Sequence, residues 1–314
     1  MALFQQAAYD LKRLFDFRTI LTGLDPGGAP QAVSPDPHPK RDAKRVGVLS
    51  GSFNPLTRAH LELARQAKES FQLDSVLFAL SLVTIDKERV EGISLEDRLL
   101  LLSTVAEELG WASVVAVNRG LYFEQARALR SLFGGKARLF FIVGMDKVMQ
   151  IFDPRYYEDR DKALAALFTE ASLIAARRPP WGEEELQRLL GRPENCGYQD
   201  RVYFLDLAGE LGRVSSSASR SGVEKDGAVQ NQLPEVVYQF ILETGAYGPR
   251  YDLRRLLLDR LYALREWAGT GVDLKKLVDV AGEDGQRGQK FRDLLSSPVP
   301  APGELKDFIL KSVG

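Results

Sequence analysis

The chain has 314 residues, of which 45% are hydrophobic and 27% charged, a composition typical of a globular protein with one large domain and appendages, or with two domains. The formal net charge is −1, so no general attraction to nucleic acid or to an anionic membrane is expected. The single cysteine, Cys196, cannot form an internal disulfide, no apolar run approaches a membrane span, and the N-terminus lacks the basic region of a secretory signal. We therefore expect a cytoplasmic protein with neither membrane nor nucleic-acid partners.

The N-terminal segment, residues 1–22, predicts an amphipathic helix because apolar side chains recur at helical spacing, at Phe4, Ala8, Leu11 and Phe15. Residues 23–44 contain five prolines and three glycines, a composition that rarely packs as a core and predicts a linker. The helix is expected to dock either on the body of the protein or on a second subunit, so a homo-oligomer is possible.

Residues 45–249 alternate short apolar runs with amphipathic segments. One segment, Ser94–Leu109, begins with a capping-box pattern formed by Ser94 and Asp97. This alternation predicts an α/β fold with a doubly wound parallel sheet, whose ligands bind at the carboxyl ends of the strands. The predicted strands are Arg45–Leu49, Ser75–Leu80, Ser113–Val117, Arg138–Val143, Ser172–Ala176 and Val202–Leu207.

Residues 250–314 predict a small helical region. Leucines recur at helical spacing, and glycine and proline divide the remainder into short helices. This region is interpreted as a helical cap or an oligomerisation element, and residues 45–249 are expected to bind nucleotide without it. The leucines of the repeat are Leu253, Leu257, Leu261 and Leu264.

A phosphate-binding motif is predicted directly after the first strand of this domain. There the chain breaks at glycine and Asn-Pro and then opens a helix, which leaves free backbone N–H groups at a helix N-terminus. His60 adds a side-chain donor, although a capping or packing histidine is the alternative interpretation. The order resembles the nucleotidyltransferase signature Gly-x-Phe-(Asp/Asn)-Pro-x-(His/Thr)-x-x-His, with matches at Gly51, Phe53, Asn54, Pro55, Thr57 and His60.

A second motif, Val214–Arg220, follows the last predicted strand and resembles the Ile-Ser-Ser-Thr-x-Ile-Arg of the same enzymes. Taken alone, a serine run is usually a loop or a helix cap. Its position after a strand, with an arginine at the expected offset, instead favours a site for the triphosphate tail of ATP, held by Ser215, Ser216 and Arg220.

Together the motifs resemble the nicotinamide- and nicotinate-mononucleotide adenylyltransferases, over about residues 45–248. The resemblance implies a Rossmann-like fold and transfer of AMP from ATP to a mononucleotide, with release of pyrophosphate, in NAD biosynthesis. His60 and Thr57 would be catalytic, and the backbone of Gly51, Ser52 and Phe53 would bind phosphate. Small nucleotides would be the partners. Mg²⁺ would be held mainly by ATP, because no dense carboxylate cluster is evident and no metal ligand is predicted.

Further residues resemble those that line the nucleotide cleft of this family. Gly144 and Asp146 resemble its Gly-Ala-Asp, although Asp146 is alternatively an N-cap of a helix at Lys147–Phe152. Lys87 and Arg98 resemble phosphate-contacting residues, but each is alternatively a solvated or helix-face charge. One arginine of the pair Arg177 and Arg178 is expected to face the cleft.

The acceptor half of the site departs from the family pattern. The segment Tyr122–Arg127 lacks both threonines of the family's Tyr-Thr-x-x-Thr-Leu, and no tryptophan follows Asp146 at the expected place. Phe152, Tyr156 or Tyr157 is the candidate for stacking on a pyridine ring. The alternatives are therefore a nucleotidyltransferase of the same superfamily with another phosphorylated acceptor, or a non-catalytic nucleotide-binding regulator.

Overall fold

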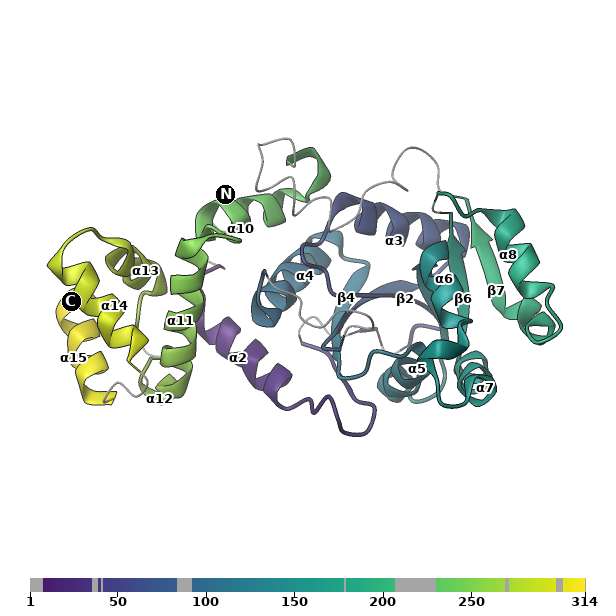
Figure 1. Cartoon of the computed structure of the whole chain (residues 1–314), viewed down its shortest axis with the longest axis horizontal. Coiled ribbons are helices and arrows are strands. Elements are labelled where there is room, and N and C mark those ends of the chain that lie inside the picture. The colour runs from purple at the N-terminus through teal and green to yellow at the C-terminus, as the bar shows by residue number, and fades with distance from the viewer. Residues whose placement is uncertain are drawn as a thin grey trace.

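The computed structural model describes residues 8–35, 39–40, 42–83, 92–177, 179–206, 230–268, 271–297 and 302–313. Among these residues, seven strands form one sheet in the order β1-β4-β3-β2-β5-β6-β7 (Figure 1). β1 is antiparallel to its neighbour, and every other pair is parallel. The strands are β1 Ala32–Val33, β2 Arg45–Gly51, β3 Ser75–Ser81, β4 Ala112–Val117, β5 Arg138–Gly144, β6 Ala171–Ala176 and β7 Val202–Leu205.

The parallel strands form because their sequences are apolar on both faces. Every residue of β3, β4 and β6 is buried, as expected where helices cover both sides of a sheet. The six strands predicted from the sequence are confirmed, with ends that differ by at most two residues. The doubly wound α/β fold is confirmed as well.

Helices cover both faces of the sheet. One apolar cluster joins one face to α3 (Arg58–Ser70) and α4 (Leu95–Leu109) and continues into α2 (Leu11–Thr22), α10 (Glu235–Thr244) and α11 (Pro249–Ala263). The other face packs against α5 (Tyr122–Arg130), α6 (Met145–Ile151), α7 (Arg160–Glu170) and α8 (Glu183–Leu190). Short 3₁₀ segments occur at η1 Ser131–Phe133, η2 Pro154–Tyr156, η3 Cys196–Arg201 and η5 Gln230–Gln232.

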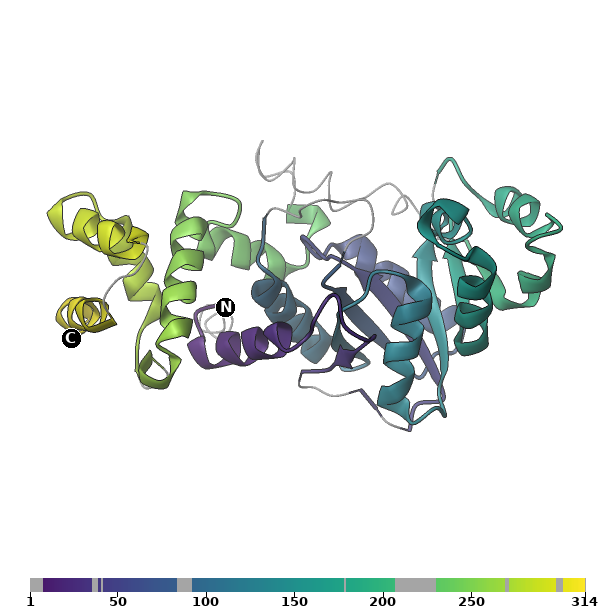
Figure 2. The same cartoon turned by 60° about the horizontal axis from the view of Figure 1, so that its bottom comes forward.

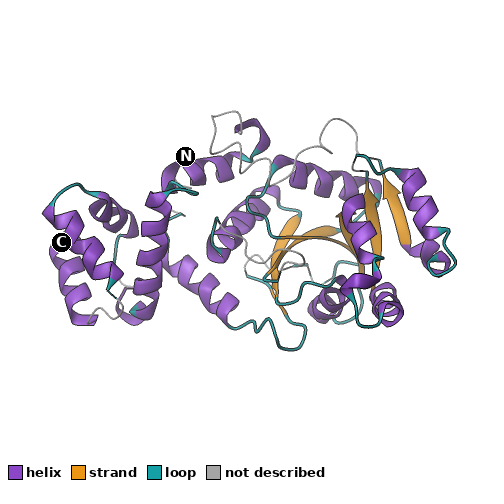
Figure 3. Cartoon of the chain, viewed as in Figure 1, coloured by secondary structure: helices purple, strands orange, loops and turns teal. Residues whose placement is uncertain are grey.

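The C-terminal region is helical, as predicted, and α11 connects it to the rest of the chain. Beyond α11 follow α12 (Arg265–Ala268), α13 (Leu274–Gly282), α14 (Gln286–Ser296) and α15 (Pro302–Val313). α13, α14 and α15 lie at the end of the molecule opposite α8 and β7, and α2 lies between α11 and the sheet (Figure 2). Figure 3 shows that the sheet lies in the part of the molecule away from α13, α14 and α15. Within the described ranges, no helix combines the length and the hydropathy needed to span a membrane.

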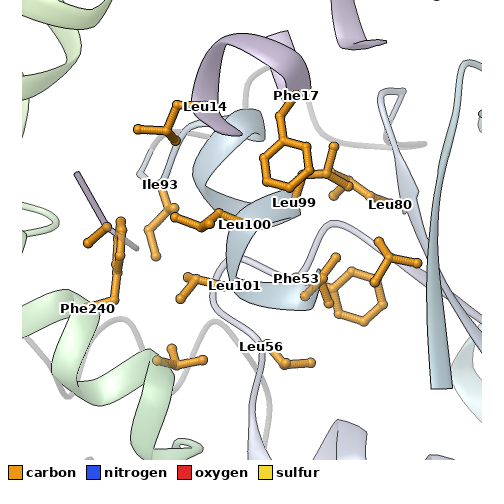
Figure 4. Close-up of a cluster of buried hydrophobic side chains, with 14 of the residues drawn as sticks. Leu14, Phe17, Phe53, Leu56, Leu80, Ile93, Leu99, Leu100, Leu101 and Phe240 are labelled. Atoms are coloured by element: carbon orange, nitrogen blue, oxygen red, sulfur yellow. The ribbon is translucent and has the colours of Figure 1, made fainter. Parts of the chain in front are cut away.

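The predicted N-terminal helix is confirmed over Leu11–Thr22 as α2, which docks on the body of the same chain; residues 8–10 precede the helix, and residues 1–7 lie outside the described residues. Asp10 caps it by accepting a hydrogen bond from the backbone of Arg13. Its buried face packs on α4, and Figure 4 shows Phe17 directed toward Leu99. Phe53 and Leu56, from the loop after β2, belong to the same cluster.

The segment predicted as a linker is packed along part of its length. β1 pairs with β4, with Ala32 opposite Val117. The fully buried Asn118 accepts a hydrogen bond from the backbone of Gln31 at 2.7 Å and donates to the carbonyls of Asp25 and Ala29 at 2.6 and 2.9 Å. A proline- and glycine-rich chain can pack here because one amide side chain satisfies its backbone groups. Residues 25–33 are exposed or only partly buried, so hydrogen bonds hold this segment on the surface of the domain, outside the core.

Candidate functional site

The candidate site lies where the winding of the sheet reverses. β2 has β3 on one side and β5 on the other, so the crossovers that follow β2 and β5 run in opposite directions. Such a switch point leaves a crevice at the carboxyl ends of the two strands. The loop after β2 carries the first motif, and the junction between β5 and α6 carries Gly144 and Asp146. The sheet therefore brings together two segments that lie about ninety residues apart.

His60 is held in one orientation by the helix that it begins. Thr57 is the N-cap of α3, and its backbone N–H donates to Nδ1 of His60 at 3.0 Å. The Thr57 hydroxyl lies 2.7 Å from the same nitrogen. Because Nδ1 accepts a hydrogen bond from the backbone, the neutral ring carries its hydrogen on Nε2. The capping interpretation of His60 therefore applies to Nδ1, and Nε2–H is the donor that the motif predicts.

Thr57 positions His60. Its side chain is 0% exposed, and its hydroxyl is engaged with the His60 ring and backbone. We therefore infer that Thr57 orients the imidazole, while its direct contact with phosphate stays a prediction.

The phosphate-binding loop contains a residue in a strained conformation. Phe53 has a φ of 43°, in the left-handed region that non-glycine residues rarely adopt. Its ring is nearly buried and meets the His60 ring edge-on, with 5.4 Å between ring centroids. Strain of this kind persists where the surrounding structure fixes it, and it is frequent at functional sites.

The segment that contains Gly92 and Ile93 packs against the phosphate-binding loop at Asn54. Asn54 is 0% exposed, and its Oδ1 accepts hydrogen bonds from the backbone of Ile93 at 3.2 Å and from the Tyr247 hydroxyl at 3.3 Å. Gly92 has a φ of +119°, and a Cβ atom there would lie 2.9 Å from Asn54 and 2.8 Å from Tyr247. Only glycine fits this approach of the two loops.

Replacement of Gly92 by alanine should separate the two loops. We expect the Gly92→Ala variant to lose about 3 kcal/mol of unfolding free energy, from backbone strain and from overpacking. Gly110→Ala is the matched control, because Gly110 also has a positive φ but nothing lies within 4 Å of its Cβ position; it should lose about 1 kcal/mol. Urea unfolding measures both, and equal losses would show that the contact with Asn54 has no effect.

Arg98 links the segment at Ile93 to the phosphate-binding loop at Ser52. It is 5% exposed, its Nε donates to the carbonyl of Ile93 at 2.6 Å, and its Nη1 donates to the carbonyl of Ser52 at 3.4 Å. The structure thus places Arg98 beside the phosphate-binding loop, as a side chain that organises its backbone. Its contact with a nucleotide remains a prediction.

Asp146 lies in the first turn of α6 and is partly buried. The N-cap of α6 is Gly144, so the alternative that Asp146 caps this helix is wrong, because the helix begins two residues earlier than predicted. Burial raises the pKa of Tyr122, and the charge of Asp146 raises it further. The altered Tyr122–Arg127 segment, which begins α5, therefore starts near Asp146.

The candidate stacking residues differ in accessibility. Phe152 is 4% exposed and packs against Phe168 and Tyr198, so its predicted role in stacking on a pyridine ring is wrong. Tyr156 and Tyr157 are partly exposed and remain candidates.

Several predicted site residues lie outside the described part of the chain: Lys87, Arg178, Ser215, Ser216 and Arg220. Arg177 is described, and its Nε pairs with Asp206 at 2.7 Å, next to the end of β7. The second motif follows β7, so its serines and Arg220 stay predictions.

Sequence reasoning missed Tyr247, Tyr251 and Arg254. Tyr247 contacts Asn54, whereas Tyr251 and Arg254 are buried against the start of α4. A usable signal is the helical spacing of Tyr251 and Arg254 with Leu258 and Leu261, all of which are buried. The predicted leucine repeat follows a helix face that only partly coincides with this buried one, because Leu253 and Leu264 are only partly buried.

Comparison with known proteins agrees with the geometry. A cytidylyltransferase-like family model matches residues 48–221, more than half of the chain. A curated relative from Citrifermentans bemidjiense, named probable nicotinate-nucleotide adenylyltransferase, is 30% identical over 223 residues, covering 65% of this chain and 98% of the relative. A relative of the same name from Moorella thermoacetica is 28% identical, covering 66% and 94%. A solved Plasmodium falciparum nicotinic acid mononucleotide adenylyltransferase, complexed with NaAD, is 15% identical with a TM-score of 0.49, covering 64% and 95%.

The chain is therefore a nucleotidyltransferase. Within that superfamily, it belongs to the nicotinate-nucleotide adenylyltransferase family.

Proposed function

We propose that the protein transfers AMP from ATP to nicotinate or nicotinamide mononucleotide and releases pyrophosphate, as a step of NAD biosynthesis. The observation that carries the proposal is the fixed imidazole of His60, whose Nδ1 accepts from Thr57 so that Nε2–H is the donor at the carboxyl end of β2. The names of the curated relatives support the choice of acceptor.

In this reaction the phosphate of the acceptor attacks the α-phosphorus of ATP, and the bond to pyrophosphate breaks. The protein has little covalent work to do, so positioning and charge stabilisation carry the catalysis. His60 donates to the α-phosphate as negative charge grows there, and backbone N–H groups of Gly51, Ser52 and Phe53 are the neutral donors of the loop.

Mg²⁺ would neutralise part of the phosphate charge. The described residues contain no group of three or more His, Cys, Asp or Glu side chains placed to hold a metal ion. In the proposed reaction the ion would be carried mainly by the oxygens of ATP and by water.

Arg220 is expected to bind the outer phosphates of ATP as a charge-assisted donor. The Arg220→Ala variant should therefore weaken ATP binding about tenfold or more and AMP binding much less, because AMP lacks those phosphates. Calorimetry with both nucleotides measures this difference. Equal losses for ATP and AMP would contradict the assignment.

The acceptor is tested by pyrophosphate release from ATP with a panel of acceptors: nicotinate mononucleotide, nicotinamide mononucleotide and 4′-phosphopantetheine. We expect release with a pyridine mononucleotide. Release with phosphopantetheine alone would favour another acceptor. The Tyr122–Arg127 segment is consistent with that alternative, because it lacks both threonines of the family pattern. Tight binding of ATP without release for any acceptor would favour the regulator.

A further inference from the structure

A fully buried ion pair joins the C-terminal region to the start of α4. Arg254, on α11, donates from Nη1 to Oδ2 of Asp97 at 2.6 Å and from Nη2 to Oδ1 at 2.8 Å, and both side chains are 0% exposed. Arg254 also donates to the carbonyl of Ala8 at 2.7 Å. Burial lowers the pKa of Arg254, but the charge and hydrogen bonds of Asp97 outweigh it, so the net pKa is raised.

Tyr251 completes this junction. Its hydroxyl donates to Oδ2 of Asp97 at 2.6 Å and accepts from the backbone N–H of Ser94 at 2.7 Å. The predicted capping box is therefore modified. Ser94 accepts from the backbone of Asp97, as predicted, but Tyr251 takes the place of Asp97 as the partner of the Ser94 N–H.

From Ser94 the contacts continue into the candidate site without a gap. The neighbouring Ile93 donates its N–H to Asn54 and accepts from Arg98, which in turn reaches the carbonyl of Ser52. Apart from the peptide bond between Ile93 and Ser94, each step is a hydrogen bond between buried or partly buried groups. The backbone that carries the phosphate-binding loop is thus tied, through Ile93 and Ser94, to Tyr251.

We propose that Tyr251 and Arg254 are positioning residues for the phosphate-binding loop, so that α11 is part of the catalytic unit. Both residues lie outside residues 48–221, which the family model matches. A buried ion pair is a poor source of net stability, and its better-attested use is to fix one arrangement of neighbouring segments. The arrangement fixed here is that of the loop that holds Asn54 and Ser52. The catalytic part of this inference rests on the proposed adenylyl transfer.

The test is Tyr251→Phe, which keeps the ring and removes one hydroxyl. Without that hydroxyl, the Ser94 N–H loses its acceptor, and the loop is held less firmly. We expect kcat for pyrophosphate release to fall about tenfold, with the KM for ATP changed less than about threefold, because small misplacement costs mostly transition-state stabilisation. Amide hydrogen exchange of the peptides that span residues 50–56 and 92–98 should become faster.

The matched control is Tyr9→Phe. The Tyr9 ring is also partly buried beside Arg254, and its hydroxyl donates to the carbonyl of Glu243 at 3.1 Å, away from residues 92–98. This variant should leave kcat and loop exchange unaltered. The proposal is overturned if Tyr251→Phe has wild-type kcat and exchange, or if Tyr9→Phe shows the same losses.

The exchange measurement also separates this inference from the proposed function. If the wild-type protein releases no pyrophosphate with any acceptor, the proposed function fails, but faster exchange at residues 50–56 in Tyr251→Phe alone would still establish the coupling. Unchanged exchange in that variant sinks the coupling even when the wild-type enzyme is active.

Discussion

His60→Ala should lower kcat about a hundredfold or more, on the scale of losing one transition-state donor. The ring is prepared for this role, because Thr57 fixes Nδ1 as the acceptor and leaves the hydrogen on Nε2. The dissociation constant for ATP should change much less, since charge at the α-phosphate grows mainly in the transition state. Single-turnover pyrophosphate release, with ATP affinity from calorimetry, measures the two effects separately.

A stability control is needed, because His60 also contributes to the capping box of α3. Loss of a cap costs about 1 kcal/mol, which leaves a protein of this size folded. His38→Ala is the activity control, since His38 is the other histidine of the chain and lies in the proline-rich segment. Near wild-type turnover in a folded His60→Ala protein would remove His60 from the mechanism.

Arg254→Leu should produce the largest loss of stability among these variants. Removal of the guanidinium leaves the Asp97 carboxylate buried without a cation, which typically costs about 3–5 kcal/mol. Urea unfolding of the full chain measures the loss as a lower midpoint.

The control for this variant is Arg250→Leu on the same helix. Arg250 pairs with Asp279 at 2.7 Å, and both side chains are about half exposed, so this change should cost within about 1 kcal/mol. Comparable midpoints for the two variants would contradict the importance given to the buried pair.

The sheet could be predicted because its sequence signals are local. The runs Val76–Leu80 and Leu139–Val143 are apolar along their whole length, and short runs of this kind between helical segments are typical of buried parallel strands. The first motif was likewise readable as strand, turn and helix start, and His60 and Gly51 lie there in the structure.

The remaining features depend on side chains far apart in the sequence. Asn118 orders the segment that holds Gln31, and Arg254 pairs with Asp97 across 157 residues. Neither residue type signals such a role locally, since asparagine is frequent in turns and arginine on helix surfaces. The helical spacing of Arg254 with Leu258 and Leu261 indicates a buried face, but no local pattern identifies Asp97 as its partner.

These long-range contacts bear most on the expectation that residues 45–249 bind nucleotide without the two ends of the chain. α2 ends at Thr22, β2 starts at Arg45 and α11 starts at Pro249. However, Leu14 and Leu261 belong to the same apolar cluster as α4. We now expect a protein truncated to residues 43–249 to expose that cluster and to bind ATP more weakly than the full chain.

The bond between Arg254 and the carbonyl of Ala8 joins residues 246 positions apart. During synthesis, the N-terminal partner leaves the ribosome first and waits roughly ten to fifty seconds for the other at ordinary elongation rates. The surface of α11 that contacts Ala8 and Tyr9 is absent throughout that interval. The nascent chain is therefore expected to expose the apolar face of α2 to chaperones until α11 has been synthesised.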